Sequence, residues 1–109
     1  MCYAFGLKKK EFEKKFKLQD FDDDIFGEYF GFDHPFTPIL TNERPAIIEL
    51  AQWGLVPPNK AADPKAFWKN ANTLNARIEK AKETSSYMDF IGNRCLILAT
   101  EFYEKKKRI

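Results

Sequence analysis

The stretch PILTNERPAIIELA, residues 38–51, decides the fold class of this chain. Two apolar runs, at 38–41 and 46–51, flank a polar segment that begins at Asn42 and ends at Pro45. Short apolar, β-branched runs on either side of turn-forming residues are typical of a β-hairpin. The sequence therefore predicts two antiparallel strands here, and with them a mostly antiparallel sheet.

Further strands and short helices are expected on both sides of this hairpin. Apolar or alternating segments predict strands at 1–5, 73–79 and 95–99, the last continued by 102–104. Amphipathic spacing and capping residues predict short helices at 7–18, at 63–70 and from Ser85 or Ser86 to 91. Residues 19–38 are expected to be irregular loop with brief extended pieces. The expected class is α+β, with a twisted, mostly antiparallel sheet or partial β-barrel and a few short helices.

Length and composition indicate one small soluble domain, residues 1–109. Of the 109 residues, 44% are hydrophobic and 31% are charged, which is ordinary for a globular protein. The apolar runs are too short for a membrane span, and the charged stretch from Lys8 interrupts any signal-peptide core. Two cysteines without zinc-type spacing lead us to expect no metal and no cofactor. We therefore expect a reduced, cytoplasmic protein.

Charged residues are clustered along the chain, although the formal net charge is only +2. Basic clusters lie at 8–10, 14–15 and 105–108, and an acidic cluster lies at 20–24. Basic clusters can follow the phosphates of a nucleic acid, but a solvated helix face and a solvated tail would have the same composition. The single histidine, His34, is expected to be a loop or core residue, with contact to a binding groove as the alternative.

Cys2 becomes the N-terminal residue if Met1 is removed, with an amine and a thiol on adjacent carbon atoms. The unperturbed pKa values of such groups, about 7.7–8.0 and about 8.5, leave each a nucleophilic fraction near neutral pH. With an aldehyde, the amine forms an imine and the thiolate then closes a five-membered thiazolidine ring. The alternative is that the Met-Cys start has no function. Cys95 differs, because its apolar neighbours predict a buried, inert thiol.

The alternating segment 73–79 places three polar side chains on one face of its expected strand. An amide such as that of Asn75 can orient an amine or an oxyanion, and the guanidinium of Arg77 suits a phosphate. With Glu79, these residues could equally form a solvated face. Glu104 follows two aromatic residues at the end of a strand, where a carboxylate suits general acid–base chemistry or is simply an exposed strand end.

Four motifs occur together and in a characteristic order. They are Met1-Cys2, then Trp53-Gly54-Leu55-Val56-Pro57, then Leu74-Asn75-Ala76-Arg77-Ile78-Glu79, and finally Arg94-Cys95-Leu96 followed by Phe102-Tyr103-Glu104. Together they span essentially the whole chain and resemble the N-terminal half of the SRAP family, the SOS response-associated peptidases. Members of that family are about twice as long, so the resemblance implies a domain that is truncated relative to the family.

The resemblance also implies a function. Family members lose the initiator methionine and capture the ring-opened aldehyde of an abasic site in single-stranded DNA as a thiazolidine DNA–protein crosslink. An autoproteolytic cysteine peptidase activity is attributed to the same site, and the implied location is cytoplasmic, at the nucleoid. Carried over by position, Cys2 would be the nucleophile, Asn75 would position its amine, and Glu104 would be the acid–base carboxylate. Arg77 would contact a DNA phosphate, and Trp53 would lie near the DNA groove or in the core.

Several residues depart from the family pattern. Tyr3-Ala4 replaces Gly-Arg after the cysteine, Lys80 replaces a threonine, and the residues that flank Phe102-Tyr103-Glu104 differ. The second family tryptophan is missing, for which Phe67 or Trp68 could substitute, and the catalytic histidine of the family's second half has no counterpart here. Crosslinking is therefore expected more firmly than processing. The alternatives are a non-catalytic module that binds single-stranded DNA, or a half-domain that pairs with another chain through an open sheet edge.

Overall fold

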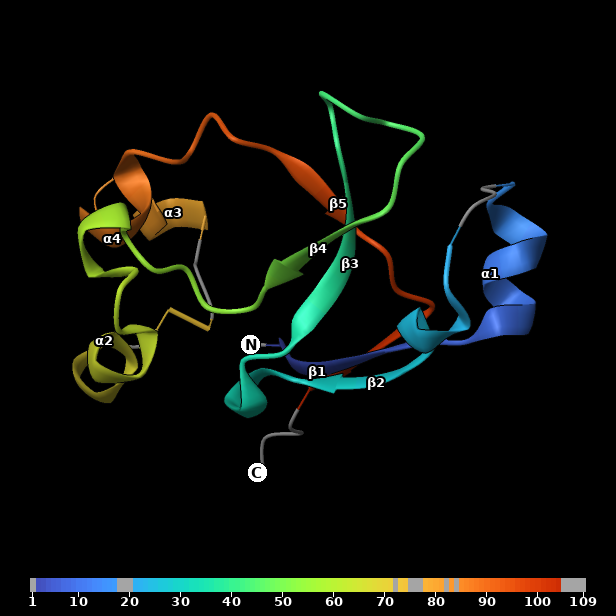
Figure 1. Cartoon of the computed structure of the whole chain (residues 1–109), viewed down its shortest axis with the longest axis horizontal. Coiled ribbons are helices and arrows are strands. Elements are labelled where there is room, and N and C mark those ends of the chain that lie inside the picture. The colour runs from blue at the N-terminus through green and yellow to red at the C-terminus, as the bar shows by residue number, and fades with distance from the viewer. Residues whose placement is uncertain are drawn as a thin grey trace.

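Figure 1 shows the fold of the chain in a computed structural model, which describes residues 2–17, 21–71, 73–74, 78–81, 83 and 85–104. The strands form two antiparallel sheets of three strands each. The first has the order β2-β1-β6, with β1 at Cys2–Leu7, β2 at Gly27–Phe30 and β6 at Glu101–Glu104. The second has the order β4-β3-β5, with β3 at Phe36–Thr41, β4 at Glu49–Gln52 and β5 at Cys95–Ile97.

The helices are all short. They are α1 at Lys9–Lys15, α2 at Pro64–Asn70, α3 at Ile78–Ala81 and α4 at Ser85–Met88, with 3-10 turns η1 at Asp23–Ile25, η2 at Gly31–Asp33 and η3 at Pro58–Lys60. In Figure 1, α1 lies at one end of the molecule, whereas α2, α3 and α4 gather at the opposite end. The α+β class is therefore confirmed. The strands that the structure describes do not close into a barrel.

The predicted hairpin is present, but its second strand begins later than expected. β3 and β4 pair antiparallel, with Phe36 opposite Gln52 and Ile39 opposite Glu49. The prediction of a strand from residue 46 was wrong, because the Ile47 amide donates to the carbonyl of Arg44 inside the turn. That hydrogen bond keeps the backbone curled, so the ladder starts only at residue 49.

The C-terminal strand prediction also needs correction, because 95–99 and 102–104 do not form one continuous strand. β5 pairs with β3 in the second sheet, and β6 pairs with β1 in the first. The link between them bonds to both sheets: the Leu98 amide donates to Pro38 O at 3.2 Å, and the Thr100 amide donates to Gly6 O at 2.9 Å. Residues 98–100 therefore carry the chain from one sheet to the other.

The core lies where this crossover meets α1. Leu7, Phe12, Ile25, Leu40 and Leu98 form one buried cluster. An aromatic group surrounds Phe12 with ring centroids 5.3–5.5 Å away, and its members are Phe16, Phe21 and Phe26. Burial of these rings attaches the helix to both sheets. The predicted helix 7–18 is shortened to α1 at its start, because Leu7 stays in β1 opposite Gly27.

Two helix predictions have different outcomes. The helix predicted at 63–70 is confirmed as α2, and the Asp63 carboxylate caps it by accepting from the Ala66 amide at 3.2 Å. The helix predicted to reach 91 ends at Met88, and the chain continues in turns closed by hydrogen bonds from Phe90 to Tyr87 and from Asn93 to Phe90.

The predicted strand 73–79 is wrong at both of its described ends. Thr73 and Leu74 belong to no strand, and residues from Ile78 onward form α3, in which Glu79 is exposed. The Leu74 carbonyl accepts a hydrogen bond from an indole rather than from a neighbouring strand. Residues 75–77 lie outside the described part of the chain. Alternation alone predicted a ladder, but a tertiary contact uses the backbone group that the ladder would need.

The environment of Tyr29 predicts how the stability of the fold depends on alkaline pH. Its hydroxyl donates to the Ile25 carbonyl at 2.5 Å, its ring stacks on Phe5 at 5.0 Å, and burial raises the pKa of the Tyr29 phenol. A raised pKa in the folded state means that the contribution to stability is complete below about pH 10 and is lost as the pH rises through the folded value. We expect Tyr29→Phe to reduce the alkaline fall in unfolding free energy, measured by denaturant titration at several pH values. An identical pH slope in wild type and variant would contradict this.

Among the described residues, no helix is long and apolar enough to cross a membrane.

Candidate functional site

The strand register brings two of the predicted site residues opposite each other. Cys2 at the start of β1 pairs with Glu104 at the end of β6. Directly opposite residues in an antiparallel pair have Cα atoms about 4.5–5.5 Å apart. The register shifts between Cys2 and Ala4, so β1 has an extra residue at Tyr3. Bulges of this kind change the direction of a side chain, and they are common beside active sites.

Trp53 links β1 to the segment that precedes Asn75. Its indole Nε1–H donates to the Leu74 carbonyl at 2.8 Å. Its ring lies 5.7 Å from that of Phe5, centroid to centroid, and packs so closely on Gly31 that a Cβ there would lie 3.2 Å from the indole. The half-buried Trp53 therefore holds Leu74 beside β1.

An open cavity of about 460 Å³ lies between the two sheets, and the same residues line part of it. Phe5 of β1, Phe102 of β6, Trp53 and Leu74 all contribute to its wall. The strands that carry Cys2 and Glu104 thus meet the residue before Asn75 around a single cavity. Sequence reasoning expected these segments to come together but did not predict the indole bond that holds one of them.

Of the remaining predicted site residues, the structure describes some and not others. Asn75 and Arg77 lie outside the described residues, so their contacts remain predictions. Glu104 is exposed at the end of its strand. Trp53 uses its one donor on Leu74, which agrees with the core alternative, and its contact with DNA stays a prediction.

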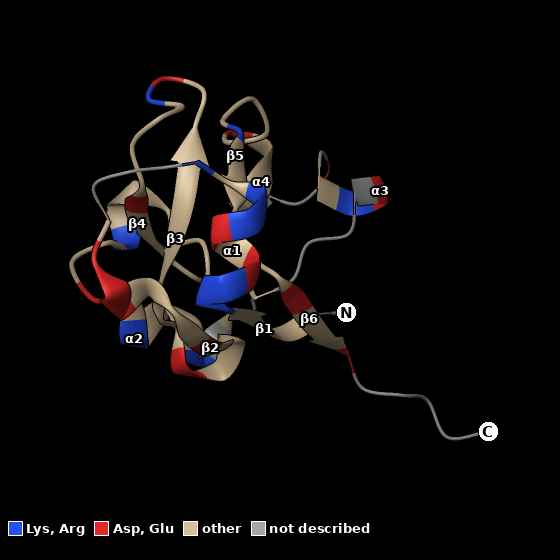
Figure 2. Ribbon diagram, turned by 90° about the vertical axis from the view of Figure 1, so that its right-hand side faces the viewer, with Lys and Arg blue, Asp and Glu red and all other residues tan. Residues whose placement is uncertain are grey.

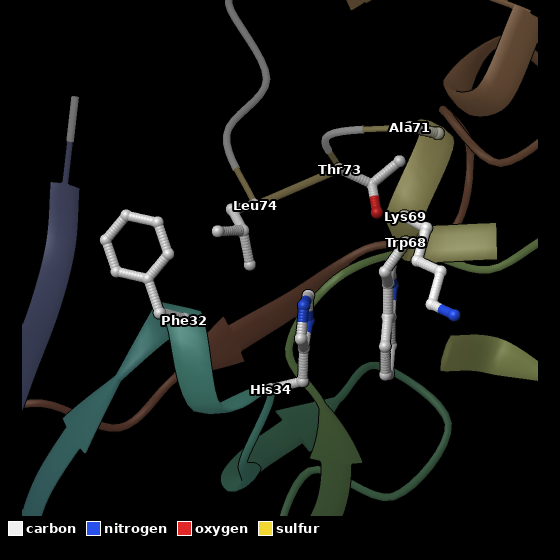
Figure 3. A pocket seen from close by; sticks show the side chains of 7 residues that line it. All are labelled: Phe32, His34, Trp68, Lys69, Ala71, Thr73 and Leu74. Carbon is white, nitrogen blue, oxygen red and sulfur yellow. The ribbon is translucent and has the colours of Figure 1, made fainter. Parts of the chain in front are cut away.

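A second pocket, of about 400 Å³, lies close to the first and is shown in Figure 3. His34 stacks on Trp68 with ring centroids 3.6 Å apart and planes 4° from parallel. A hydrogen bond of 2.9 Å joins His34 Nδ1 to the Trp53 carbonyl, and the His34 backbone is left-handed, with φ 47°. Gly54 is required beside this pair, because its φ is +105° and a Cβ would lie 2.6 Å from His34 Nδ1. His34 is thus a pocket residue, and nothing in the sequence pattern indicated its stacking partner.

A match to a protein-family model shows which family the chain belongs to. The model described as SOS response associated peptidase (SRAP) matches residues 1–108, which is nearly the whole chain. The chain belongs to the SRAP family. No curated protein and no solved structure gives a significant match to it. The SRAP family is associated by name with a peptidase role and with the SOS response.

Two lysines of the first basic cluster in this SRAP chain are paired with carboxylates. Lys8 Nζ lies 3.3 Å from a Glu101 oxygen, and Lys9 Nζ lies 3.1 Å from Asp23. The hydrogen bond and the charge of Glu101 raise the pKa of Lys8. Figure 2 shows acidic and basic residues mixed over α1. These pairs favour a solvated helix face over a phosphate-binding surface at this end of the molecule.

The prediction of a buried thiol at Cys95 was wrong, because its side chain is exposed. It begins β5, an outer strand of its sheet, in which Leu96 and Ile97 are also exposed, at 66% and 59%. The apolar run was interpreted as a core strand, but Cys95 and Ile97 line the open cavity between the sheets. The SRAP chain therefore has an accessible thiol at Cys95. The described residues contain no group of three His, Cys, Asp or Glu side chains that could hold a metal ion.

The bond from Trp53 to Leu74 allows a matched test of stability. Trp53→Phe keeps an aromatic ring but removes the indole donor, so we expect the free energy of unfolding to fall by about 1 kcal/mol more than for a control that loses no hydrogen bond. Trp68→Phe is that control, because the buried Trp68 Nε1 has no partner among the described residues. Urea titration of both variants measures the difference, and equal losses would show that the Trp53 bond adds nothing.

Proposed function

We propose that this SRAP-family chain captures the aldehyde of abasic sites in single-stranded DNA through the aminothiol of Cys2. The observation that carries the proposal is the pairing of Cys2 with Glu104 at a bulged strand end. The strands that carry the two residues also line the open cavity between the sheets, through Phe5 and Phe102. This pairing gives an N-terminal nucleophile a carboxylate neighbour, which is the arrangement that proton transfer during ring closure needs.

The reaction uses only groups of this chain and of the DNA. After removal of Met1, the α-amine of Cys2 attacks the aldehyde carbon, and loss of one water molecule gives an imine. The Cys2 thiolate then adds to the imine carbon, the imine nitrogen takes up a proton, and a thiazolidine ring results. We assign the proton transfers to Glu104. Asn75 would orient the amine and Arg77 would bind the adjacent phosphate, as the family resemblance implies.

Two measurements on the native protein test this function. Intact-mass spectrometry is expected to show a protein that lacks Met1, because the aminothiol exists only then. Incubation with single-stranded DNA that contains one abasic site is expected to give a covalent adduct heavier than the protein by the DNA mass, less one water molecule. Matched DNA with an intact base is the control and should give none. A retained Met1 or the absence of an adduct would rule the function out.

A second function has its own supporting observation. Large apolar side chains are exposed on both sheets, among them Leu50 at 61%, Leu96 at 66% and Phe102 at 70%. Exposed apolar surface of this kind is typical of a protein interface. The alternative is therefore a non-catalytic half-domain that a partner chain covers.

The test of that alternative is light scattering coupled to gel filtration. A half-domain that pairs with its own copy should show a molar mass that rises with concentration, and Leu96→Lys should restore a monomer. A constant monomeric mass together with adduct formation would exclude a need for self-association.

A further inference from the structure

We propose that the pocket shown in Figure 3 holds one unpaired nucleobase, stacked on His34, from the nucleotide next to the captured abasic site. The proposal rests on the proposed function, because it concerns the DNA strand that would enter the same site. It adds a subsite that recognises a base, whereas the aminothiol recognises the position that has none.

The stacking platform is formed by two rings that pack face to face, those of His34 and Trp68. One face of His34 is covered by Trp68, and Figure 3 shows the other face turned into the pocket, with Phe32 on the opposite side. The imidazole is held by the bond of its Nδ1 to Trp53, and the His34 carbonyl accepts from Gln52 Nε2 at 3.0 Å. A base that stacked on this free face would extend the His34–Trp68 stack by one ring without moving it.

The opposite wall of the pocket is a large aromatic ring that is unusually exposed. Phe32 is 72% exposed, although it belongs to η2 between two strands. In Figure 3 its ring lies across the pocket from His34, so a base between them would cover apolar surface of both. The volume of about 400 Å³ lies within the range of small-molecule sites, about 300–1,000 Å³.

A buried polar group points to a ligand with hydrogen-bonding edges. Thr73 is 7% exposed, and its Oγ1 has no hydrogen-bond partner among the described residues. Figure 3 shows this hydroxyl pointing into the pocket, between the Leu74 side and the Trp68 side. Buried hydroxyl groups are normally paired, and every nucleobase has acceptors and donors along its edge. Lys69 also lines the pocket and adds a positive charge for a phosphate.

The pocket lies next to the site of capture. Gly31 precedes Phe32 in η2, and a Cβ on Gly31 would lie 3.3 Å from the Tyr3 carbonyl, one residue after Cys2. Leu74 lines both this pocket and the cavity between the sheets. A nucleotide whose base enters the pocket would therefore be a close neighbour of the nucleotide held by Cys2.

The test uses the full chain and a thymine oligonucleotide with a tetrahydrofuran abasic analogue, which has no aldehyde and cannot crosslink. The fluorescent base 2-aminopurine is placed next to the analogue or six nucleotides away. Stacking quenches its fluorescence, so we expect stronger quenching at the adjacent position. Phe32→Ala should weaken binding by about fivefold or more, because base–aromatic stacking contributes that much. Phe36→Ala removes another exposed phenylalanine, outside the pocket, and should bind like wild type.

Thr73→Val separates a ligand contact from a structural one. It replaces an unpaired buried hydroxyl with a methyl group of the same shape, so the unfolding midpoint should stay unchanged or rise. Binding of the adjacent 2-aminopurine should nevertheless weaken by about threefold. A fall in the unfolding midpoint with unchanged binding would mean that the hydroxyl serves the fold alone, and would overturn its assignment to the ligand.

The remaining outcomes distinguish the two proposals. Equal quenching at both positions, or equal effects of Phe32→Ala and Phe36→Ala, would overturn the base pocket while leaving adduct formation intact. Position-dependent quenching without any adduct on natural abasic DNA would instead overturn the capture function. The last control measures binding of free 2-aminopurine riboside, which has no DNA strand attached. Quenching of the free nucleoside at the same concentration as the oligonucleotide would identify a nucleoside site and would overturn the link to the DNA strand.

Discussion

Replacing Cys2 with alanine is expected to abolish the covalent adduct with abasic single-stranded DNA. The variant keeps the α-amine after removal of Met1, so it can still form an imine, but it has no sulfur to close the ring. Water hydrolyses an imine readily, whereas the thiazolidine ring is stable in water. Denaturing gel analysis after heating in water is therefore expected to show the adduct for wild type and none for Cys2→Ala.

The exposed Cys95 makes a second cysteine variant necessary. An accessible thiol can react with aldehydes by itself, and Cys95 lies on β5, which is not the strand of Cys2. Cys95→Ala is expected to form the adduct at the wild-type rate, because an isolated thiol gives only a reversible hemithioacetal. Loss of the adduct in Cys95→Ala, with retention in Cys2→Ala, would move the reactive centre to the second sheet and contradict the assignment. Borohydride trapping of the imine in Cys2→Ala adds a check that the variant still binds the lesion.

Replacing Glu104 with glutamine is expected to slow adduct formation by about a hundredfold or more, which is the lower range for loss of a general acid–base group. The amide keeps the size of the side chain but cannot accept and return a proton. Glu104 lies opposite Cys2 in the register and is exposed, so the substitution should leave the fold unchanged. Single-turnover rates measure the effect, and affinity for DNA with the unreactive abasic analogue should stay the same.

Glu101→Gln is the matched control on the same strand. Glu101 lies opposite Gly6 and pairs with Lys8, so its carboxylate acts at the other end of β6. We expect this control to retain the wild-type rate of adduct formation. If both glutamine variants slow the reaction equally, the effect comes from the charge of β6 as a whole, and Glu104 has no particular role in proton transfer.

Local pattern predicted much of this fold because the relevant forces act over a few residues. The turn residues between 38–41 and 46–51 predicted the β3–β4 hairpin, and Asp63-Pro64 predicted α2 with its cap. The same patterns were misleading where a distant group competed for the backbone. Leu74 is the clearest case, since an alternating segment loses its ladder to the indole of Trp53, which is 21 residues away in sequence.

The candidate site also has one part that the sequence predicted and another that depends on tertiary structure. The chemistry of Cys2 as an N-terminal aminothiol depends on the residue itself, so the sequence was sufficient to nominate it. Its opposition to Glu104 depends on the register of β1 against β6, which pairs the two ends of the chain. No local propensity encodes a register between segments so far apart; the burial of Leu7 and Leu98 and the bond from Thr100 to Gly6 set it.

The sequence alone therefore determined the nucleophile that we propose, the family motifs, and the strands and helices with strong local signals. Tertiary structure alone decided that Cys95 is exposed, that His34 stacks on Trp68, and that residues 98–100 cross between sheets. The physical reason is that exposure and stacking depend on which distant surfaces cover a side chain. Those surfaces exist only after the two sheets have formed and packed.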